Sequence, residues 1–325
     1  MRAVQITSLN GPDAIAIADS VAPVASADQV LIKVHAAGAS FPELLQTRGL
    51  YHVKPPLPYI PGCEVAGEIV SAPPSSKFTP GDRVAALPMV GGLPMLGGFA
   101  EMAVAQVDMT FALPEQVSFI QGASLPLNYL TAYFALIERA GMKRGESVLV
   151  HGAAGGLGTA ATQMAKAFGA DSVIAVTSTH EKGSAAVAAG ADKYVLADGF
   201  SPAVKELGGV DIVFDPVGGD RFTDSLRTLK EDGRLLVIGF AAGSIPTVQV
   251  NRLLLSNITV VGAGWGTYAP KRPGHMQTEW EAIVPHVRSG ALNPIIGGTY
   301  PLNDASAALR ELDGRRAIGK IILTM

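Results

Sequence analysis

A glycine-rich segment in the middle of the chain has the residue types that bind a diphosphate. A pyrophosphate needs backbone N–H groups at short range and the positive end of a helix dipole, and only small side chains let it approach so closely. Gly155 and Gly158 stand at the second and third glycine positions of the dinucleotide fingerprint, and Ala153 stands at the first. The whole segment is Gly152, Ala153, Ala154, Gly155, Gly156, Leu157 and Gly158.

The surroundings of this segment decide between binding and a purely structural turn. Residues 147–151 before it form an apolar run that predicts a strand, and residues 157–168 predict a helix that ends at Gly169. Strand, glycine loop and helix in this order are the context that the fingerprint requires. The sequence therefore favours dinucleotide binding.

The end of the next predicted strand, residues 172–177, indicates which dinucleotide fits. In proteins that prefer NAD, an acidic residue about 20 residues after the glycines binds the adenine ribose, and no carboxylate stands at this strand end. The hydroxyls of Thr177 and Ser178 and the cation of Lys182 would instead pair with a 2′-phosphate, which favours NADPH. Glu181 is the observation against this interpretation, and the alternative is that Lys182 only solvates the start of a helix.

A parallel sheet is needed to position these residues. From Leu125 onward, β-rich runs alternate with helical segments such as residues 181–189. This alternation is typical of a doubly wound α/β domain, which we place over residues 126–264. The predicted strands are residues 147–151, 172–177, 193–196, 211–215, 234–239 and 258–262.

The part before this sheet has a different texture. Short β-type runs separated by turn residues predict a compact, mostly antiparallel β domain over residues 1–125. Near the end of the chain, residues 303–312 predict a helix and residues 317–323 a strand, and we expect residues 265–325 to complete the first domain. The β-type runs of the first part are residues 1–6, 29–36, 63–70, 83–86 and 99–104.

Composition excludes several classes of protein. The 325 residues are 48% hydrophobic and 16% charged, which excludes a disordered or fibrous chain. Lysine and arginine number 25 against 28 acidic residues, without a basic run, so we expect no nucleic-acid partner. The single cysteine, Cys63, excludes an internal disulfide and a zinc site of several thiolates. No signal-peptide pattern and no apolar stretch of about twenty residues is present, so we expect a cytoplasmic protein without a membrane contact.

Five segments, in this order, resemble the medium-chain dehydrogenase/reductase superfamily in its zinc-independent quinone oxidoreductase branch, the zeta-crystallin-like proteins. The resemblance implies a GroES-like catalytic domain and a Rossmann domain with strand order 3-2-1-4-5-6, with a cleft between them. It also implies hydride transfer from NADPH to a quinone or another conjugated carbonyl. The matching segments are residues 36–38, 61–67, 81–84, 130–133 and 148–158.

Two positions separate this chain from the zinc-dependent alcohol dehydrogenases that the superfamily also contains. Where those enzymes have a cysteine and a histidine as zinc ligands, this chain has Ser40 and Cys63, and their four-cysteine structural loop has no counterpart. Catalytic zinc holds an alkoxide as a Lewis acid, so we infer no metal and an acceptor that needs less polarisation. Cys63 fits a small buried residue better than a nucleophile. Ser40 replaces the asparagine of many quinone reductases and could take over part of its contact near the nicotinamide.

The segment of residues 49–58 also resembles a loop of the mitochondrial 2-enoyl thioester reductases. In those enzymes a tyrosine at the position of Tyr51 is the proposed proton donor to the carbon beside the carbonyl. Hydride addition to the β carbon leaves an enolate that must be protonated, and a phenol can supply that proton. Tyr51 could equally be an aromatic wall against a quinone ring. A 2-enoyl thioester or enone reductase is therefore the second hypothesis.

The resemblance implies further contacts. Asn128 and Thr131, at the start of a helix, would position the nicotinamide ring, unless they only cap that helix. Lys320, in the last basic stretch of the chain, would lie near the phosphates or the substrate. The remaining implied cofactor contacts are Tyr194, Gly239, Phe240, Ala241 and Trp265.

Two expectations concern partners. A protein with this phosphate loop could also bind NADPH mainly as a sensor or interaction partner with weak reductase activity. Residues 257–264 predict an apolar strand at the edge of the parallel sheet, and an unpaired edge favours pairing with another strand. Members of the family often join two such strands across a twofold axis, so we expect a homodimer.

Overall fold

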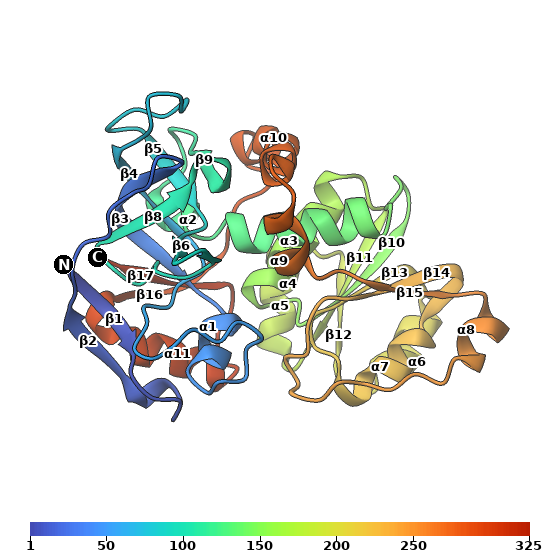
Figure 1. Ribbon diagram of the computed structural model, residues 1–325. Helices are drawn as coiled ribbons and strands as arrows, with labels where there is room; N and C mark the ends of the chain where they lie inside the picture. Colours follow the sequence, from blue (N-terminus) through green and yellow to red (C-terminus); the bar gives the residue numbers. More distant parts are fainter. The chain divides into compact units, whose positions relative to one another are not determined.

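The computed structural model describes residues 1–325, and the chain forms two compact units (Figure 1). Unit 1 comprises Met1–Leu127, Arg272–Glu281 and Ile296–Met325, and unit 2 comprises Asn128–Lys271 and Ala282–Ile295. The tail after residue 264 is thus shared between the units, whereas we had assigned all of it to the first domain. The reason lies in α10 (His275–Arg288), whose Trp280 stacks on Phe111 in unit 1 and whose His286 stacks on Phe168 in unit 2.

Unit 1 is built on a seven-stranded, mostly antiparallel sheet. Its strand order is β16-β17-β3-β4-β5-β9, and β8 also pairs with β3. Strand β17 near the C-terminus pairs antiparallel with β3, so the end of the chain completes the first domain as the sequence predicts. These strands are β3 (Gln29–Ala39), β4 (Val65–Ser71), β5 (Arg83–Ala86), β8 (Met102–Gln106), β9 (Thr110–Ala112), β16 (Ile296–Pro301) and β17 (Lys320–Thr324).

Smaller elements surround this sheet. Strands β1 (Arg2–Ile6) and β2 (Ile15–Asp19) form one two-stranded sheet, and β6 (Met89–Val90) and β7 (Leu93–Pro94) form another. The helices of unit 1 are α1 (Phe41–Gln46), α2 (Phe119–Gly122), α11 (Ala305–Asp313) and the 3-10 turns η1 (Pro12–Ala14), η2 (Val107–Met109) and η7 (Leu302–Asp304).

Alternating side chains create the core of unit 1. Along β3, Val30, Ile32 and Val34 are buried, while Lys33 between them is exposed. A strand presents successive side chains to opposite faces, so this alternation buries one face of the sheet. Helix α11 covers that core with Ala305, Ala308 and Leu309, whose i, i+3, i+4 spacing places them on one face of the helix.

Unit 2 contains the six-stranded parallel sheet that the sequence predicts. Its order, β12-β11-β10-β13-β14-β15, is the expected order 3-2-1-4-5-6. All five residues of β10 are buried, which is typical of a central strand in a sheet covered on both faces. The strands are β10 (Ser147–His151), β11 (Ser172–Thr177), β12 (Lys193–Leu196), β13 (Val210–Asp215), β14 (Leu229–Val237) and β15 (Thr259–Gly262).

One strand of unit 2 differs clearly from its prediction. We expected a strand over residues 234–239, but β14 begins at Leu229 and ends at Val237. Leu229 pairs with Val210 across an irregularity in the ladder, and Asp232 takes a positive φ of 61° there. The early part of β14 was invisible in the sequence because lysine, glutamate, aspartate and glycine are uncommon in strands.

The helices of unit 2 connect these strands. Helix α3 (Thr131–Tyr133) is flanked by the π-helical turns η3 (Pro126–Leu130) and η4 (Phe134–Arg139), and the phosphate-loop helix is α4 (Gly156–Ala167). No helix of the protein is long and apolar enough to cross a bilayer. The others are α5 (His180–Ala188), α6 (Phe200–Glu206), η5 (Gly219–Arg221), α7 (Phe222–Leu226), α8 (Asn251–Ser256), α9 (Trp265–Tyr268) and η6 (Ala269–Lys271).

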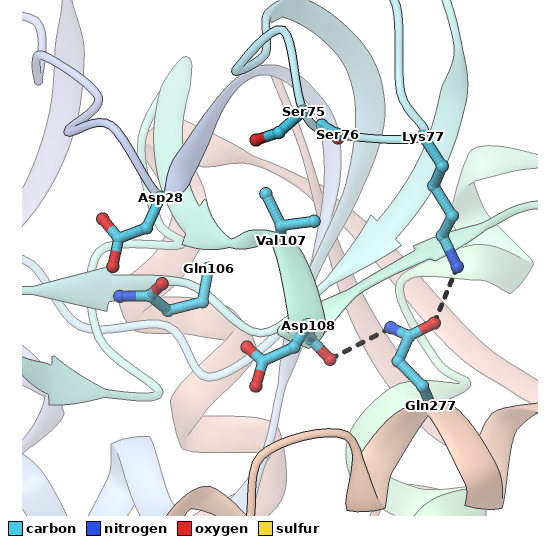
Figure 2. Close-up of a pocket in the computed structure, with 8 residues that line it drawn as sticks. All are labelled: Asp28, Ser75, Ser76, Lys77, Gln106, Val107, Asp108 and Gln277. Carbon is cyan, nitrogen blue, oxygen red and sulfur yellow. Dashed lines mark hydrogen bonds between the residues drawn. The ribbon is translucent and has the colours of Figure 1, made fainter.

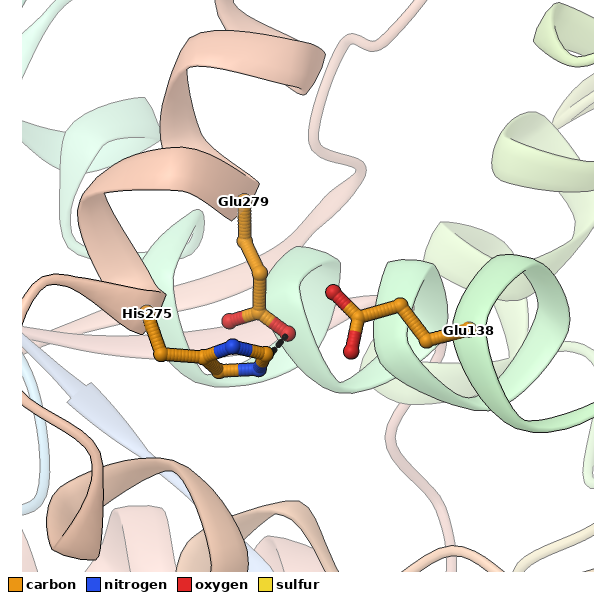
Figure 3. A group of neighbouring side chains, drawn as sticks. All are labelled: Glu138, His275 and Glu279. Carbon is orange, nitrogen blue, oxygen red and sulfur yellow. Dashed lines mark ion pairs between the residues drawn. The ribbon is translucent and has the colours of Figure 1, made fainter.

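The first turns of α10 are fixed to unit 1 by polar contacts. Gln277 Nε2 donates to the carbonyl oxygens of Asp108 and Thr110, at 3.0 and 2.9 Å. His275 Nε2 lies 3.3 Å from Glu279 Oε1, one helical turn further on (Figure 3, which also draws Glu138 of unit 2). The two Gln277 contacts explain why the start of α10 belongs to unit 1.

Candidate functional site

The loop between β10 and α4 is folded tightly on itself. Gly152 has a φ of +60°, and the Gly155 N–H donates to the Gly152 carbonyl oxygen at 3.0 Å. A Cβ atom on Gly158 would stand 2.2 Å from that same oxygen and 2.6 Å from Ala153 Cα, so only glycine fits there. The first N–H groups of a helix have no partner inside the helix. The loop therefore presents unshielded backbone donors at the start of α4, as a diphosphate requires.

The carboxyl end of β11 holds the residues predicted to bind a 2′-phosphate. Ser178 is exposed and Lys182 is half-buried. Thr177 is buried, and its hydroxyl donates to the Thr179 carbonyl oxygen at 3.1 Å, so it shapes the loop. Thr179 caps α5 by accepting from the Lys182 N–H at 3.2 Å. Ser178 and Lys182 are thus the predicted residues that the structure places at this surface.

The structure adds His180 to this neighbourhood. The exposed His180 ring lies at the start of α5, with Nδ1 3.1 Å from the hydroxyl oxygen of Tyr194 on β12. A Cβ atom on Gly183 would stand 2.3 Å from the Tyr194 ring, so this glycine lets the ring lie against α5. Nothing in the local sequence links His180 to Tyr194, because their contact depends on β11 pairing with β12.

Loops after β13 and β14 lie beside the phosphate loop. Asp215 ends β13, and its Oδ1 accepts from the N–H groups of Val217 and Gly218 at 2.8 and 2.9 Å. The predicted contacts Gly239, Phe240 and Ala241 follow β14, and Ala241 N–H donates to the Pro216 carbonyl oxygen at 3.1 Å. Strands β10 and β13 are adjacent at the point where the strand order reverses, and open α/β sheets bind ligands at this point.

Three predicted contacts lie elsewhere in unit 2. Asn128, in η3, and Thr131, at the start of α3, make no side-chain hydrogen bond, which argues against the helix-capping alternative. Their polar groups are therefore available to a ligand. Trp265 lies in α9 with its side chain 1% exposed, and its cofactor contact stays a prediction.

In unit 1, Ser40, Cys63 and Lys320 meet in a buried polar cluster with two glutamates. Glu43 Oε2 accepts from the Ser40 N–H at 2.9 Å, and Oε1 accepts from the Cys63 N–H at 2.7 Å. Lys320 Nζ donates to Ser40 Oγ and to Glu64 Oε1. The side chains of Glu64 and Lys320 are 0% and 4% exposed. We call these five residues the Lys320 cluster.

This geometry bears on the predicted role of Lys320. We expect its ammonium group near the phosphates or the substrate, and in the structure it is buried and paired with Glu64. A buried ammonium group needs a close partner because its desolvation is costly. Lys320 therefore belongs to the interior of unit 1, and it acts on a ligand only through its neighbours.

Tyr51 lies close to this cluster. Burial, together with the neighbouring Cys63 and Glu43, raises the pKa of Tyr51 well above its usual value. Burial also raises the pKa of the Cys63 thiol, and so do the nearby carboxylates. The structure confirms that Cys63 is a buried residue, and a thiol held in this protonated form is a poor nucleophile.

A separate pocket of unit 1 lies away from these residues. Its volume is about 480 Å³, and Figure 2 shows that Lys77 and Gln277 join at one end of it. Lys77 Nζ donates to Gln277 Oε1 at 2.8 Å. No predicted site residue lines this pocket, whose residues are Asp28, Ser75, Ser76, Lys77, Gln106, Val107, Asp108 and Gln277.

Comparison with known proteins identifies the family. Residues 26–115 match the model of the alcohol dehydrogenase GroES-like domain, and residues 156–287 match that of the zinc-binding dehydrogenases. The whole chain is 34% identical over 336 residues to the human protein named quinone oxidoreductase, covering 98% of it. The protein is a member of the quinone oxidoreductase branch of the medium-chain dehydrogenase/reductase superfamily.

Other members of the quinone oxidoreductase branch agree over the full length. The mouse quinone oxidoreductase-like protein 2 is 35% identical over 331 residues, which cover this whole chain and 92% of that protein. The quinone oxidoreductase of Thermus thermophilus, solved also as its complex with NADPH, is 33% identical with a TM-score of 0.86, and both chains are covered completely. The match to the zinc-binding dehydrogenase model begins at residue 156. It therefore does not include Ser40 and Cys63, the two positions where the zinc-dependent enzymes have ligands.

Proposed function

We propose that this protein is an NADPH-dependent oxidoreductase that reduces a quinone or another conjugated carbonyl compound without a metal ion. The observation that carries the proposal is the phosphate loop, where a Cβ atom on Gly158 would stand 2.2 Å from a backbone oxygen. Glycine at this place lets α4 pack closely on the loop, as the dinucleotide fingerprint requires. The similarity to quinone oxidoreductases over the whole chain supports the class of acceptor.

The residues of unit 2 fit NADPH along its length. The backbone N–H groups at the start of α4 would bind the diphosphate, and Ser178 and Lys182 would bind the 2′-phosphate. Tyr194, held by Gly183 and His180, would lie beside the adenine. Residues 239–241, in the loop after β14, would lie along the sugar and phosphates of NADPH. NADPH bound in this way supplies the hydride.

The nicotinamide end needs groups that fix the ring without reacting. Asn128 and Thr131 have polar side-chain atoms that make no bond within the protein. An amide and a hydroxyl can hold a carboxamide in one orientation, and fixed orientation contributes strongly to the rate of a transfer between two bound molecules. These two residues are therefore the proposed orienting groups.

Consumption of NADPH, with NADH in parallel, tests this proposal. The acceptors are benzoquinones, naphthoquinones, alkenals and short 2-enoyl thioesters at matched concentrations. We expect turnover with quinones and a clear preference for NADPH, because Ser178 and Lys182 would bind the 2′-phosphate. Tight NADPH binding without turnover of any acceptor would contradict the proposal and favour a sensor or interaction protein.

The place of Tyr51 beside Cys63 and Glu43 supports a second candidate, an enone or 2-enoyl thioester reductase. Like any tyrosine phenol, Tyr51 carries a proton at physiological pH, and burial raises its pKa further. A proton donor beside the acceptor would protonate the enolate that follows hydride addition. A hydroquinone anion has less need of such a donor, since solvent can protonate it after release.

Replacing Tyr51 with phenylalanine separates the two candidates. For a proton donor, we expect Tyr51→Phe to reduce kcat on an enone at least tenfold and kcat on a quinone only slightly, because the ring and its packing remain. Equal losses on both acceptors would show that Tyr51 is only a packing wall. The variant's thermal midpoint serves as the control for folding.

We also propose that the protein is a homodimer joined through β15. This strand lies at the edge of the parallel sheet, where its outer backbone groups have no partner strand. Beside it, Val250, Leu254 and Leu255 of the α8 region are exposed by 71%, 76% and 78%. An open edge next to exposed apolar side chains favours contact with a second copy of the chain.

A further inference from the structure

The Lys320 cluster leaves one hydrogen-bond donor without a protein partner. A serine hydroxyl has a single hydrogen, and its oxygen accepts from other donors. Ser40 Oγ accepts from Lys320 Nζ, and the Ser40 hydroxyl donates to no group of the protein. The neighbouring Glu43 accepts instead from the backbone N–H groups of Ser40 and Cys63. Because Ser40 Oγ accepts from Lys320 Nζ, the Ser40 hydroxyl hydrogen points away from Lys320.

The surroundings fix this orientation. Lys320 is held from its other side by Glu64, whose second oxygen accepts from the Leu127 N–H at 2.9 Å. Gly38 makes room for the pair, because a Cβ atom there would stand 2.7 Å from both Glu64 Oε1 and Lys320 Cε. The ammonium group therefore cannot turn away from Ser40 without leaving a buried carboxylate unpaired.

A hydroxyl that accepts from an ammonium group is a stronger donor than an isolated one. Hydrogen bonds in a chain polarise one another, and the effect grows in a water-poor interior. Reduction of a conjugated carbonyl moves negative charge onto its oxygen as the hydride adds to carbon. A fixed donor aimed at that oxygen stabilises the transition state without any reorganisation.

We propose that Lys320 is a positioning residue that holds the Ser40 hydroxyl as the donor to the carbonyl oxygen of the acceptor. In this proposal the positive charge stays inside unit 1, and only the Ser40 hydrogen touches the substrate. Ser40 then acts on the acceptor rather than on the nicotinamide. The inference rests on the proposed function, since it assumes an acceptor carbonyl beside Ser40.

Binding of 4-nitrophenol in the presence of NADP⁺ tests this inference without turnover. Its phenolate absorbs visible light and mimics an acceptor oxygen that carries negative charge. We expect Ser40→Ala to weaken phenolate binding at least tenfold relative to the neutral phenol, seen as a higher pKa of the bound ligand. Ser40→Thr keeps the hydroxyl and should restore binding. Ser124→Ala is the matched control, because Ser124 is a buried serine that donates only to the Ile120 carbonyl oxygen.

Lys320 is tested together with Glu64, because a lone buried carboxylate would destabilise the fold. The double variant Glu64→Gln/Lys320→Met removes both charges, and we expect it to raise the bound ligand's pKa although Ser40 remains. An unchanged phenolate preference in Ser40→Ala and in the double variant would overturn the inference.

The acceptor panel distinguishes this failure from failure of the proposed function. Quinone turnover by the wild-type protein, with the same phenolate binding in Ser40→Ala, would overturn the inference alone. Phenolate binding that depends on Ser40, with no acceptor reduced, would overturn the proposed reaction alone. With both intact, Ser40→Ala should reduce kcat more for enones than for benzoquinones, because the poorer acceptor depends more on stabilisation of its oxygen.

Discussion

Individual polar side chains of this protein have their roles set by burial. The pKa of Glu43 is raised by burial, and the pKa values of Tyr51 and Cys63 are raised by burial and by nearby charges. These groups favour their neutral forms because water is absent to solvate a charge. Glu64 is paired directly with Lys320, and this ion pair lies beside Ser40.

His151, the last residue of β10, shows the same effect in unit 2. Its Nε2 lies 2.8 Å from Ser225 Oγ, and the Ser225 hydroxyl donates to the Arg221 carbonyl oxygen at 2.9 Å. Because the one hydrogen of Ser225 is already used, His151 Nε2 must carry the hydrogen of the neutral ring. Burial lowers the pKa of His151 to about 4.

We predict that this histidine makes the fold less stable in acid. Its folded pKa of about 4 lies below the unfolded value of 6.5, so the unfolded chain binds more protons between these pH values. Its contribution to the free energy of unfolding is complete above pH 6.5 and is lost as the pH falls toward 4, by about 3 kcal/mol. Urea unfolding at a series of pH values measures this loss.

The control is His151→Gln, whose amide nitrogen can still donate to Ser225. This variant should lose less stability than the wild-type protein over the same pH range. Parallel curves for the two proteins would show that His151 does not titrate as described.

At the scale of elements, the connection from β10 to α4 is the most constrained in the protein. Gly152, Gly155 and Gly158 have different reasons to be glycine. Gly152 adopts a positive φ of 60°, and Gly158 has backbone atoms of the same loop where a Cβ would stand. Gly155 has an ordinary φ of −79°, and a Cβ there would be 3.4 Å from the nearest atom. The fingerprint glycines are therefore not equivalent.

This difference gives a prediction about loop variants. Gly158→Ala forces the loop apart, so we expect the free energy of unfolding to fall by about 1–3 kcal/mol and NADPH binding to weaken at least tenfold. Gly155→Ala should leave the free energy of unfolding nearly unchanged. Thermal unfolding and fluorescence titration with NADPH measure the two effects. Equal destabilisation by the two alanines would show that the loop is not folded as described.

For the whole molecule, distant parts of the chain meet in each unit. Strand β17 pairs with β3, with Ile321 opposite Ala39. This register places Lys320 beside Ser40, although the two residues are 280 positions apart in the sequence. The Lys320 cluster therefore exists only when the C-terminal strand is in place.

The proposed homodimer gives a prediction at this scale. Thr259 is the exposed first residue of β15, and a lysine on an edge strand discourages pairing with another strand. We expect the wild-type protein to scatter light as a dimer of the 33.6 kDa chain and Thr259→Lys to scatter as a monomer. Thr278→Lys adds the same charge at an exposed position of α10 and should leave the dimer intact. A wild-type monomer would contradict the proposal.

The sequence by itself determined the parallel sheet and the phosphate loop, and the family resemblance implied the strand order. Those features depend on local patterns: apolar runs of β-forming residues, glycines at fixed spacing, and a helix that follows directly. Strands β10, β11 and β12 have the predicted bounds because each is a short apolar or β-branched run between turn residues. The resemblance to the family rested on similar short segments.

Only the tertiary structure decided what surrounds each side chain of the candidate site. The pairing of Lys320 with Glu64 and Ser40, the burial of Trp265 and the contact of His180 with Tyr194 all join residues from different elements. Such contacts follow from strand register and packing, which no local pattern contains. Lys320 illustrates the difference, because the family resemblance implied a contact near the phosphates or the substrate, whereas strand pairing places its side chain in the interior of unit 1. Whether a polar group meets water, a partner or a ligand is settled by the fold as a whole.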